Sequence, residues 1–336
     1  MTVMLAVDAM SGDKGVAATV PAAIRFLKDY PDAKLILVGD KKLLHQVLAS
    51  QMPFLEGRLT IQHASTIVKM DESPQVALRS KKDSSMRITI EQVKENRAQA
   101  AISAGNTGAL MAMAYFVLKM LPNIHRPAIA KFIPRLDGVT CVLDLGANLD
   151  ATPDQLLQFG LMGAELMRAT EKIASPKIGL LNIGTEETKG SDTLRRAREL
   201  MLNSDLNYQG YVEGNDLFSG VVHVVVTDGF TGNIALKTSE GLAHLISGIL
   251  HEEFNKTWWR RCCALAALPT LKHVRARLDP RRYNGASLLG LRGLVVKSHG
   301  SADEQGFYYA LVHAYLAVHQ HIVKHIAQHA ESMAGT

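Results

Sequence analysis

Cysteine and long apolar runs are both scarce in this sequence. It has three cysteines in 336 residues, and Cys262 and Cys263 are adjacent, a spacing that rarely forms a disulfide. The most apolar helical stretch, residues 109–121, is too short to span a bilayer and already contains Lys119. The first apolar run meets Asp8 early and has no basic segment before it, so no signal peptide is predicted. We therefore expect a cytoplasmic protein without a transmembrane helix.

Motifs that mark several common enzyme classes are also missing. No loop has the spacing of a Walker A or GxGxxG motif, which argues against a bound nucleoside triphosphate or dinucleotide. There is no GxSxG nucleophile elbow, and Cys141 lies within an apolar run. No Cys/His spacing and no paired aspartates indicate a metal site. The sequence predicts neither a metal nor a cofactor.

Positive charge is concentrated in one segment. The formal net charge is +5, but residues 254–282 alone carry +7, because eight basic residues stand against Asp279 alone. The eight are Lys256, Arg260, Arg261, Lys272, Arg275, Arg277, Arg281 and Arg282. Since the rest of the chain carries about −2, the basic character belongs to a local feature and nucleic acid is not a predicted partner.

Short apolar runs alternate with amphipathic ones along most of the chain. Strands are predicted at residues 3–7, 34–38, 59–62, 100–103, 129–133, 139–143, 178–183 and 221–227. Helices are predicted at residues 17–29, 42–50, 88–95, 109–120, 153–170, 193–203, 234–253 and 303–329. This alternation favours an α/β fold with a mostly parallel sheet covered on both faces. We expect one α/β catalytic domain over residues 1–336, with residues 254–284 as a basic helical excursion from it.

Four glycine-containing polar loops follow predicted strands, at residues 8–13, 103–109, 182–190 and 227–233. In a parallel sheet such loops emerge at the carboxyl edge, where ligands of α/β proteins bind. Glycine lets the backbone approach a ligand, and the free N–H groups at a helix start favour an anion. A single loop of this kind is often only a tight connection, but four together predict a shared site for an anionic ligand.

In order along the chain, these and neighbouring blocks resemble the phosphate acyltransferases of bacterial glycerolipid synthesis (fatty acyl-carrier-protein:phosphate acyltransferases). The blocks are VDAMSGD at Val7, SAGNTGA at Ser103, RPAIA at Arg126, LDLGAN at Leu143, LLNIGTEETKG at Leu180, GYVEGND at Gly210, VVTDGFTGNIALK at Val225, GASLLGL at Gly285 and VVKSHGSAD at Val295. They extend from about residue 5 to 310. Ser11 and Asn284 depart from the pattern, since the family has glycine at both positions.

The resemblance implies a three-layer α/β/α fold similar to those of phosphotransacetylases and isocitrate/isopropylmalate dehydrogenases, assembled as a homodimer. It implies transfer of a fatty acyl group from acyl-carrier protein to inorganic phosphate, for phospholipid synthesis. The acyl-phosphate would then pass to a membrane glycerol-3-phosphate acyltransferase. Alternatives are a phosphotransacetylase-like enzyme that uses acyl-CoA, an isopropylmalate-type dehydrogenase and a non-catalytic membrane-associated scaffold.

Acyl transfer to phosphate requires groups that hold a multiply charged nucleophile and stabilise an oxyanion. The candidate catalytic residues are Lys189, His299, Asn233 and Asp228. The candidate substrate-binding residues are Asp8, Asn106, Thr107, Asn148, Thr231 and Lys297. Each has a structural alternative, because loop lysines are usually solvated and Asn, Thr and Asp often cap helices.

The basic segment combines aromatic and cationic residues. Phe254, Trp258 and Leu265 fall at helical spacing, with Trp259 alongside. Cationic residues lie on the opposite side, among them Arg260 and Arg261. Paired tryptophans with arginines are typical of a helix at an anionic membrane interface, which predicts peripheral contact with the inner face of the membrane. The alternatives are packing against a dimer mate and docking of the acidic carrier protein.

Overall fold

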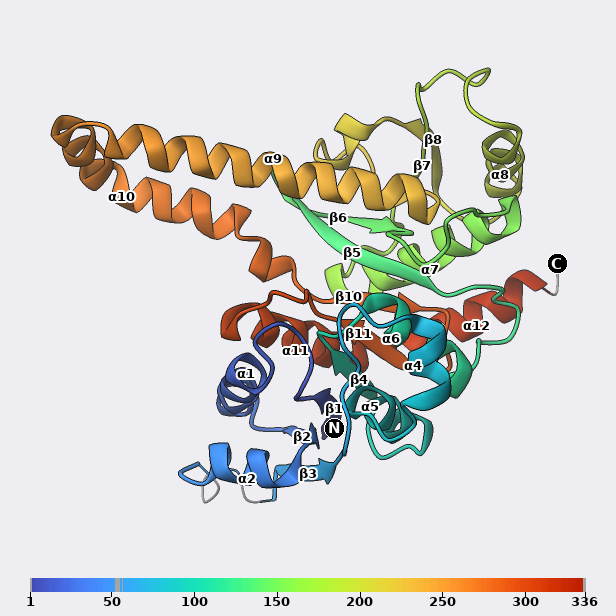
Figure 1. The fold of residues 1–336 in the computed structure, drawn as a ribbon. Helices are drawn as coiled ribbons and strands as arrows, with labels where there is room; N and C mark the ends of the chain where they lie inside the picture. The colour runs from blue at the N-terminus through green and yellow to red at the C-terminus, as the bar shows by residue number, and fades with distance from the viewer. Residues whose placement is uncertain (1, 52–54, 56, 335–336) are drawn as a thin grey trace.

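An 11-stranded sheet runs through the protein, and the computed structural model describes residues 2–51, 55 and 57–334 of it (Figure 1). The strand order is β3-β2-β1-β4-β11-β10-β5-β6-β9-β7-β8. The strands are β1 (Val3–Asp8), β2 (Ala33–Gly39), β3 (Leu59–His63), β4 (Ala100–Ser103), β5 (Ala128–Arg135), β6 (Gly138–Leu143), β7 (Ile178–Leu181), β8 (Tyr208–Val212), β9 (Val224–Val226), β10 (Ala286–Leu289) and β11 (Leu294–Lys297). The predicted α/β class with a mostly parallel sheet is confirmed.

The sheet has two parallel halves joined by antiparallel pairs in the middle. Strand β10 is antiparallel to β11 and to β5, and β5 is antiparallel to β6. As a result β6, β9, β7 and β8 run opposite to β1, β4 and β11, so the expectation of one common carboxyl edge is wrong. Sheet twist of roughly 20–25° per strand turns β6 by about 80–100° over the four steps from β4. The loops at the carboxyl ends of the two halves therefore lie at an angle to one another.

Helices cover both faces of this sheet. They are α1 (Val16–Asp29), α2 (Lys41–Leu48), α4 (Pro74–Ser80), α5 (Ser85–Lys94), α6 (Thr107–Leu118), α7 (Pro153–Glu171), α8 (Asp192–Leu202), α9 (Gly229–Asn255), α10 (Trp258–Leu278), α11 (Glu304–His319) and α12 (Ile322–Ala334), with 3₁₀ turns η1 (Gly214–Leu217) and η2 (Pro280–Tyr283). Alternate residues of β1 show the two-sided burial, since Val3 and Leu5 join one buried cluster and Ala6 the other. The first cluster contains Phe26 and Phe307, which are fully buried.

Helix α7 illustrates how the local sequence sets an element. Thr152 and Gln155 form a reciprocal capping box, and Pro153 occupies the first turn, where its missing N–H costs nothing. The predicted start at residue 153 is therefore confirmed. The predicted single helix over residues 303–329 is wrong, because His321 takes a positive φ of 53° and separates α11 from α12.

The long helix α9 and the returning helix α10 form a hairpin that projects from the body (Figure 1). The predicted apolar stripe from Phe254 to Leu265 on one helix is wrong, because α9 ends at Asn255. Thr257 then caps a new helix by accepting a hydrogen bond from the backbone N–H of Arg260. We call α9 beyond Ser239, together with α10, the arm. In the described part of the chain, no helix is both long and apolar enough to cross a membrane.

Candidate active site

The loops after β1, β4 and β11 are bonded into one cluster. The carboxylate of Asp8 is fully buried and accepts a 2.8 Å hydrogen bond from the hydroxyl of Ser103. The hydroxyl of Ser11 bonds the Asp8 carbonyl at 3.2 Å and accepts from the backbone N–H of Ala104 at 2.9 Å. Burial raises the pKa of Asp8. The Asp8 carboxylate therefore holds the loops after β1 and β4 together. Ser11, at a position where the family pattern has glycine, adds its hydroxyl to the same contact.

Close packing at Gly12 explains why this loop requires glycine. The residue has a φ of 84°, and an added Cβ would lie 2.9 Å from the Cβ of Ala104 and 3.0 Å from the carbonyl oxygen of Gly300. The next residue, Asp13, donates its backbone N–H to that same carbonyl at 2.8 Å. The loop after β1 is thus fixed against the loop after β11.

Lys297 and His299 lie in this cluster. Lys297 is 9% exposed, and its ammonium donates to the carbonyls of Ala104 (3.3 Å) and Ser298. Burial lowers the pKa of Lys297 to about 8, Lys237 acts in the same direction, and Asp13 opposes them. The amine therefore titrates close to neutral pH, with one N–H left over when it is charged.

The imidazole of His299 is held in one tautomer. The backbone N–H of Ser301 donates to its Nδ1 at 3.2 Å, which assigns the ring proton to Nε2. Burial lowers the pKa of His299, so the neutral form with an Nε2–H donor predominates at neutral pH. Asn284 fixes the turn, because its Oδ1 accepts from the His299 N–H at 2.9 Å and its Nδ2 donates to Ser298 Oγ at 2.8 Å.

The loops after β6 and β9 form a second cluster around buried Asp144. Its carboxylate accepts from the backbone N–H groups of Ile129 (2.9 Å) and Asn148 (2.6 Å) and from the Asn148 amide at 2.9 Å. Burial raises the pKa of Asp144. The Asn148 carbonyl in turn accepts from the N–H of Gly229 at 2.7 Å. Asn148 therefore joins the two loops, a structural role beside its predicted substrate-binding one.

The start of α9 carries three of the predicted site residues. Asp228 caps the helix, accepting from the Thr231 backbone N–H at 2.7 Å and from its hydroxyl at 2.8 Å. Asn233 is exposed, and its side chain lies next to Gly146 of the β6 loop. Of the three, Asn233 takes no part in this cap. The side chains of Asp228 and Thr231 are hydrogen-bonded to each other.

Helix α9 connects the second cluster to the first. Glu240 on α9 forms an ion pair of 3.0 Å with Lys131 of β5 and one of 2.9 Å with Lys237. After burial, the charges that act on the pKa of His299 are Glu240, Lys237, Lys297 and Lys131, so these charged groups lie near its imidazole. We call the region that holds these five side chains, on β5, α9 and the β11 loop, the cleft. Lys131 and Lys237 were not among the predicted site residues, although Lys131 directly follows one signature block and Lys237 ends another.

Two further candidates open helix α6. Asn106 accepts from the Ala109 N–H at 2.9 Å and donates to the carbonyls of Met70 (2.7 Å) and Glu72 (3.0 Å). Its side chain therefore caps α6 and holds the segment that precedes α4. Thr107 is the first residue of α6 and is exposed.

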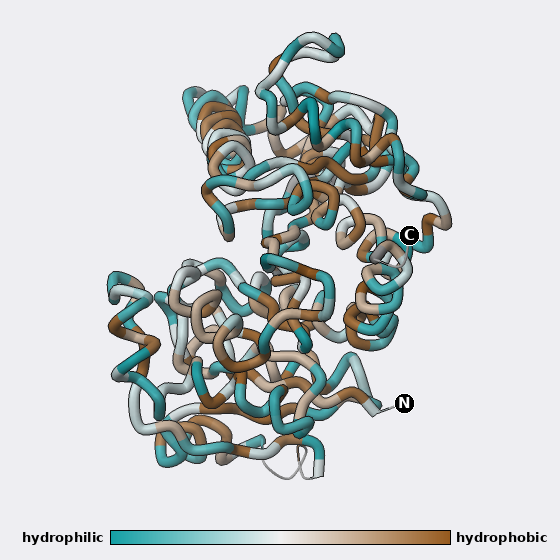
Figure 2. The backbone as a smooth tube through the Cα atoms, turned by 90° about the vertical axis from the view of Figure 1, so that its right-hand side faces the viewer, coloured by the Kyte–Doolittle hydropathy of each residue, from teal (hydrophilic) through white to brown (hydrophobic). Residues whose placement is uncertain are grey.

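Lys189 lies away from these loops. It is in the loop between β7 and α8, which projects at the top of Figure 1 and again at the top of Figure 2. Its ammonium pairs with Glu186 at 2.8 Å, which raises the pKa of Lys189, and its side chain is 46% exposed. The structure therefore joins the loops after β1, β4 and β11 in one cluster and the loops after β6 and β9 in a second, and the loop that carries Lys189 lies apart from both.

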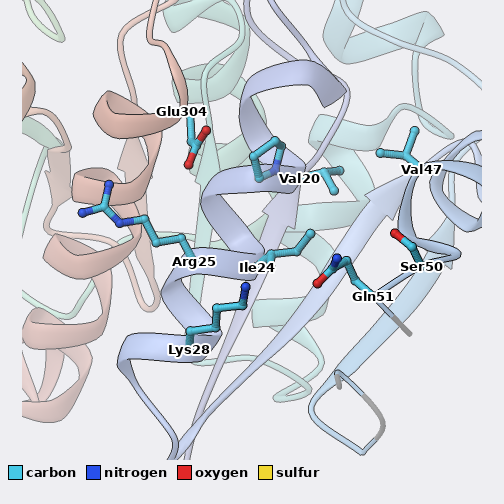
Figure 3. Close-up of a pocket in the computed structure, with 9 residues that line it drawn as sticks. Val20, Ile24, Arg25, Lys28, Val47, Ser50, Gln51 and Glu304 are labelled. Atoms are coloured by element: carbon cyan, nitrogen blue, oxygen red, sulfur yellow. The ribbon is translucent and has the colours of Figure 1, made fainter. Parts of the chain in front are cut away.

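An open groove elsewhere on the surface does not coincide with the cleft. It has a volume of about 480 Å³ and lies between α1 and α2, with Ile24, Arg25 and Glu304 on its walls (Figure 3). None of the predicted site residues lines it. The cleft, in which the predicted residues and perturbed pKa values coincide, is therefore the candidate active site.

Comparison with known proteins decides the family. A family model described as "Fatty acid synthesis protein" matches residues 3–325. A phosphate acyltransferase from Chromobacterium violaceum is 59% identical over 327 residues, which cover 97% of this chain and 95% of the relative. The chain belongs to the phosphate acyltransferase family. A phosphate acyltransferase from Legionella pneumophila is 53% identical over 322 residues, covering 96% and 94%.

Solved structures confirm the fold expected for this phosphate acyltransferase family member. A phosphotransacetylase from Streptococcus pyogenes superimposes with a TM-score of 0.64 at 20% identity, covering 95% of this chain and 94% of the other. The EutD phosphotransacetylase from Staphylococcus aureus gives 0.60 at 14% identity, covering 94% of each chain. At these identities the likeness concerns the fold alone. The predicted enzyme class, an acyltransferase, is confirmed by the phosphate acyltransferase relatives.

Proposed function

We propose that this protein transfers a fatty acyl group from acyl-carrier protein to inorganic phosphate and releases acyl-phosphate for phospholipid synthesis. The observation that carries the proposal is the grouping of Lys131, Lys237 and Lys297 around His299, whose pKa all three lower in addition to burial. Convergent cations and N–H donors suit a phosphate nucleophile and a developing oxyanion.

Direct attack by phosphate fits the state of the buried cysteine. Cys141 is fully buried, and burial raises the pKa of its thiol, which keeps it protonated and unreactive. In the proposed step a phosphate oxygen forms a bond to the thioester carbonyl carbon, and the carbon–sulfur bond then breaks. Hydrogen phosphate loses one proton and the departing thiolate gains one, so the reaction balances without a cofactor.

Two residues of the β11 loop have chemistry matched to this step. The neutral imidazole of His299 donates its Nε2–H to the tetrahedral oxyanion, an interaction of a kind worth about 2.7–4 kcal/mol. The pKa of Lys297, about 8, is close to the pKa of an ordinary thiol. Its ammonium therefore protonates the leaving sulfur. Asn233, at the start of α9, is proposed as a further neutral donor.

The acyl donor is tested by comparing two thioesters. We expect acyl-phosphate from a long-chain acyl-carrier protein plus phosphate, with a higher kcat/KM than from the matching acyl-CoA. A higher kcat/KM with acyl-CoA would support the phosphotransacetylase-like alternative. No acyl-phosphate from either thioester would overturn the proposed function and favour the non-catalytic scaffold.

The arm supports a further proposal, peripheral attachment to the membrane. Trp258 and Trp259 stack with ring centroids 3.8 Å apart and are 62% and 65% exposed. Arg260 and its neighbour Arg261 are exposed too, but Arg260 pairs with Glu253, so part of the basic edge is neutralised within the arm. Exposed tryptophans next to arginine suit the interface of an anionic bilayer.

Flotation with anionic liposomes tests this attachment. We expect the full-length protein to float and the Trp258→Ala/Trp259→Ala variant to remain in the dense fraction. Equal flotation of the two proteins would show that these tryptophans are not the anchor. Attachment would place acyl-phosphate beside a membrane glycerol-3-phosphate acyltransferase, the proposed acceptor of the product.

Apolar residues along the arm also support a proposed homodimer. Leu242, Leu245 and Ile249 on α9 are each at least half exposed, which leaves an apolar face available to a second copy. Sedimentation equilibrium of the full chain tests this assembly, and a monomer at micromolar concentration would contradict it. Within each copy we propose one catalytic domain over residues 1–336, from which the basic segment 254–284, shared between the arm and η2, departs.

A further inference from the structure

A three-residue bridge crosses the cleft from the body to α9. The carboxylate of Glu240 accepts from the ammonium of Lys131 at 3.0 Å with one oxygen and from that of Lys237 at 2.9 Å with the other. Lys131 is on β5, whereas Lys237 and Glu240 are one turn apart on α9. The bridge therefore ties the helix that carries Asn233 to the central part of the sheet.

The bridge differs from an ordinary surface ion pair in its burial. The side chains of Lys131 and Glu240 are 16% and 23% exposed, whereas that of Lys237 is 57% exposed. Burial alone would raise the pKa of Glu240, but the two lysines outweigh it and lower that pKa. Glu240 therefore stays ionised, and a single carboxylate holds two ammonium groups together.

The bridge has a net positive charge. Lys131 and Lys237 carry two positive charges against one on Glu240. Lys297, which also lies near the His299 imidazole, adds charge when protonated, and Asp13 opposes it. Each lysine has three N–H donors and gives one to Glu240. The remaining N–H groups of the two ammonium groups can donate hydrogen bonds to the oxygens of one tetrahedral dianion.

We infer that Lys131 and Lys237 form the subsite for inorganic phosphate and that Glu240 is the positioning residue that sets their separation. This inference rests on the proposed function. Phosphate held here lies between α9 and the β11 loop, next to His299. One phosphate oxygen can then point toward a thioester carbonyl whose oxyanion His299 would receive.

Steady-state kinetics with varied phosphate test the subsite in the full-length protein. We expect Lys237→Met and Lys131→Met each to raise the KM for phosphate about 10- to 100-fold, because each variant loses one charge-assisted hydrogen bond to phosphate. The KM for the acyl donor should change less than about twofold, because the two lysines contact phosphate and not the acyl donor. Lys237→Arg should restore part of the affinity. Lys94→Met, which changes an exposed lysine on α5, is the matched control.

A direct measurement separates binding from turnover. Titration of the protein with inorganic phosphate, without acyl donor and followed by ³¹P NMR, should show weaker binding to Lys237→Met than to wild type. Glu240→Ala should also raise the KM for phosphate about tenfold, with kcat at saturating phosphate nearly unchanged, because it removes positioning rather than chemistry. Thermal unfolding of each variant checks that it is folded.

The outcomes distinguish the two proposals. If wild type makes acyl-phosphate while Lys131→Met and Lys237→Met keep the wild-type KM for phosphate, the subsite is wrong and the proposed function stands. If wild type makes no acyl-phosphate but binds phosphate through these lysines, the proposed function is wrong and the subsite stands. If Lys131→Met disturbs α9, the exposed Lys237 still decides the subsite.

Discussion

The loop after β11 and the loop after β7 have similar composition and different surroundings. Each is polar and glycine-containing, and each has a lysine within or beside it, Lys297 in one and Lys189 in the other. The β11 loop is bonded to Asp13 and Asn284 from other parts of the chain. The β7 loop bonds mainly to itself, through Glu186. Two loops of similar composition therefore differ in burial and bonding because their neighbours in the fold differ.

Strand position explains this difference. Strand β11 lies near the centre of the sheet between β4 and β10, whereas β7 is next to the edge strand β8. A loop at the centre has other loops on both sides, which remove water and perturb pKa values. A loop near the edge is open to solvent, where an ion pair contributes little. Four predictions test this contrast, in order of decreasing effect.

Replacing the buried lysine should have the largest effect. Lys297→Met should lower kcat about 100- to 1000-fold, because it removes the proposed proton donor while keeping a side chain of similar length. Acyl-phosphate formation measured as hydroxamate checks this, with thermal unfolding as the control for folding. A variant with nearly wild-type kcat would show that burial of Lys297 is structural only.

The lowered pKa of Lys297 should also appear in the pH dependence of stability. Between pH 8 and about 10.5 the unfolded state binds more protons than the folded one, so unfolding free energy rises with pH, by at most about 3 kcal/mol. Chemical denaturation across this range should show the rise in wild type and not in Lys297→Met. The kcat of wild type should fall over the same range as the proton donor is lost. Equal pH profiles for the two proteins would contradict the pKa of about 8.

Loss of the bracing asparagine should have an intermediate effect. Asn284→Ala removes the partners of the His299 N–H, the Ser298 hydroxyl and the Gly306 carbonyl. We expect unfolding free energy to fall by about 2 kcal/mol and kcat to fall about tenfold, since His299 loses its fixed position. Denaturant unfolding and product assays measure the two. A large loss of stability with unchanged kcat would separate the loop from the chemistry.

The exposed lysine should matter least. Lys189→Met makes the same chemical change as Lys297→Met, and we expect kcat and the KM for phosphate to stay within about threefold of wild type, because Lys189 has a solvated ion pair. The same hydroxamate assay measures both constants. A 100-fold loss would show that the β7 loop closes over the cleft during turnover, and would overturn the contrast drawn above.

Much of the fold could be predicted from periodicity and local signals. The strand at residues 100–103 and the start of α7 at residue 153 match the structure, because an apolar run and a capping box are properties of neighbouring residues. The turn at residues 255–257 was not predicted, since apolar spacing continues across it. Strand β10 was also missed, because its four residues lie within a short apolar run that has no alternation.

The candidate site was predicted only in part, for a related reason. Lys297 and His299 were chosen because they belong to a glycine-containing block, and the structure places them in the β11 strand and the loop that follows it. Lys131 lies within a strand and Lys237 within a helix. A lysine in such an element is normally expected to be solvated. Their significance depends on Glu240, which contacts both and is 109 residues from Lys131.

By itself the sequence determined the helices and strands with strong local signals, the family, and the glycine-containing polar loops that follow strands. The tertiary structure decided which loops meet, because the antiparallel pairs around β10 and β5 and the twist of the sheet set the relation between its halves. That relation joins residues more than a hundred positions apart. Such distant residues come together only when the whole core packs, so no local pattern could have shown that Lys297 is buried and Lys189 exposed.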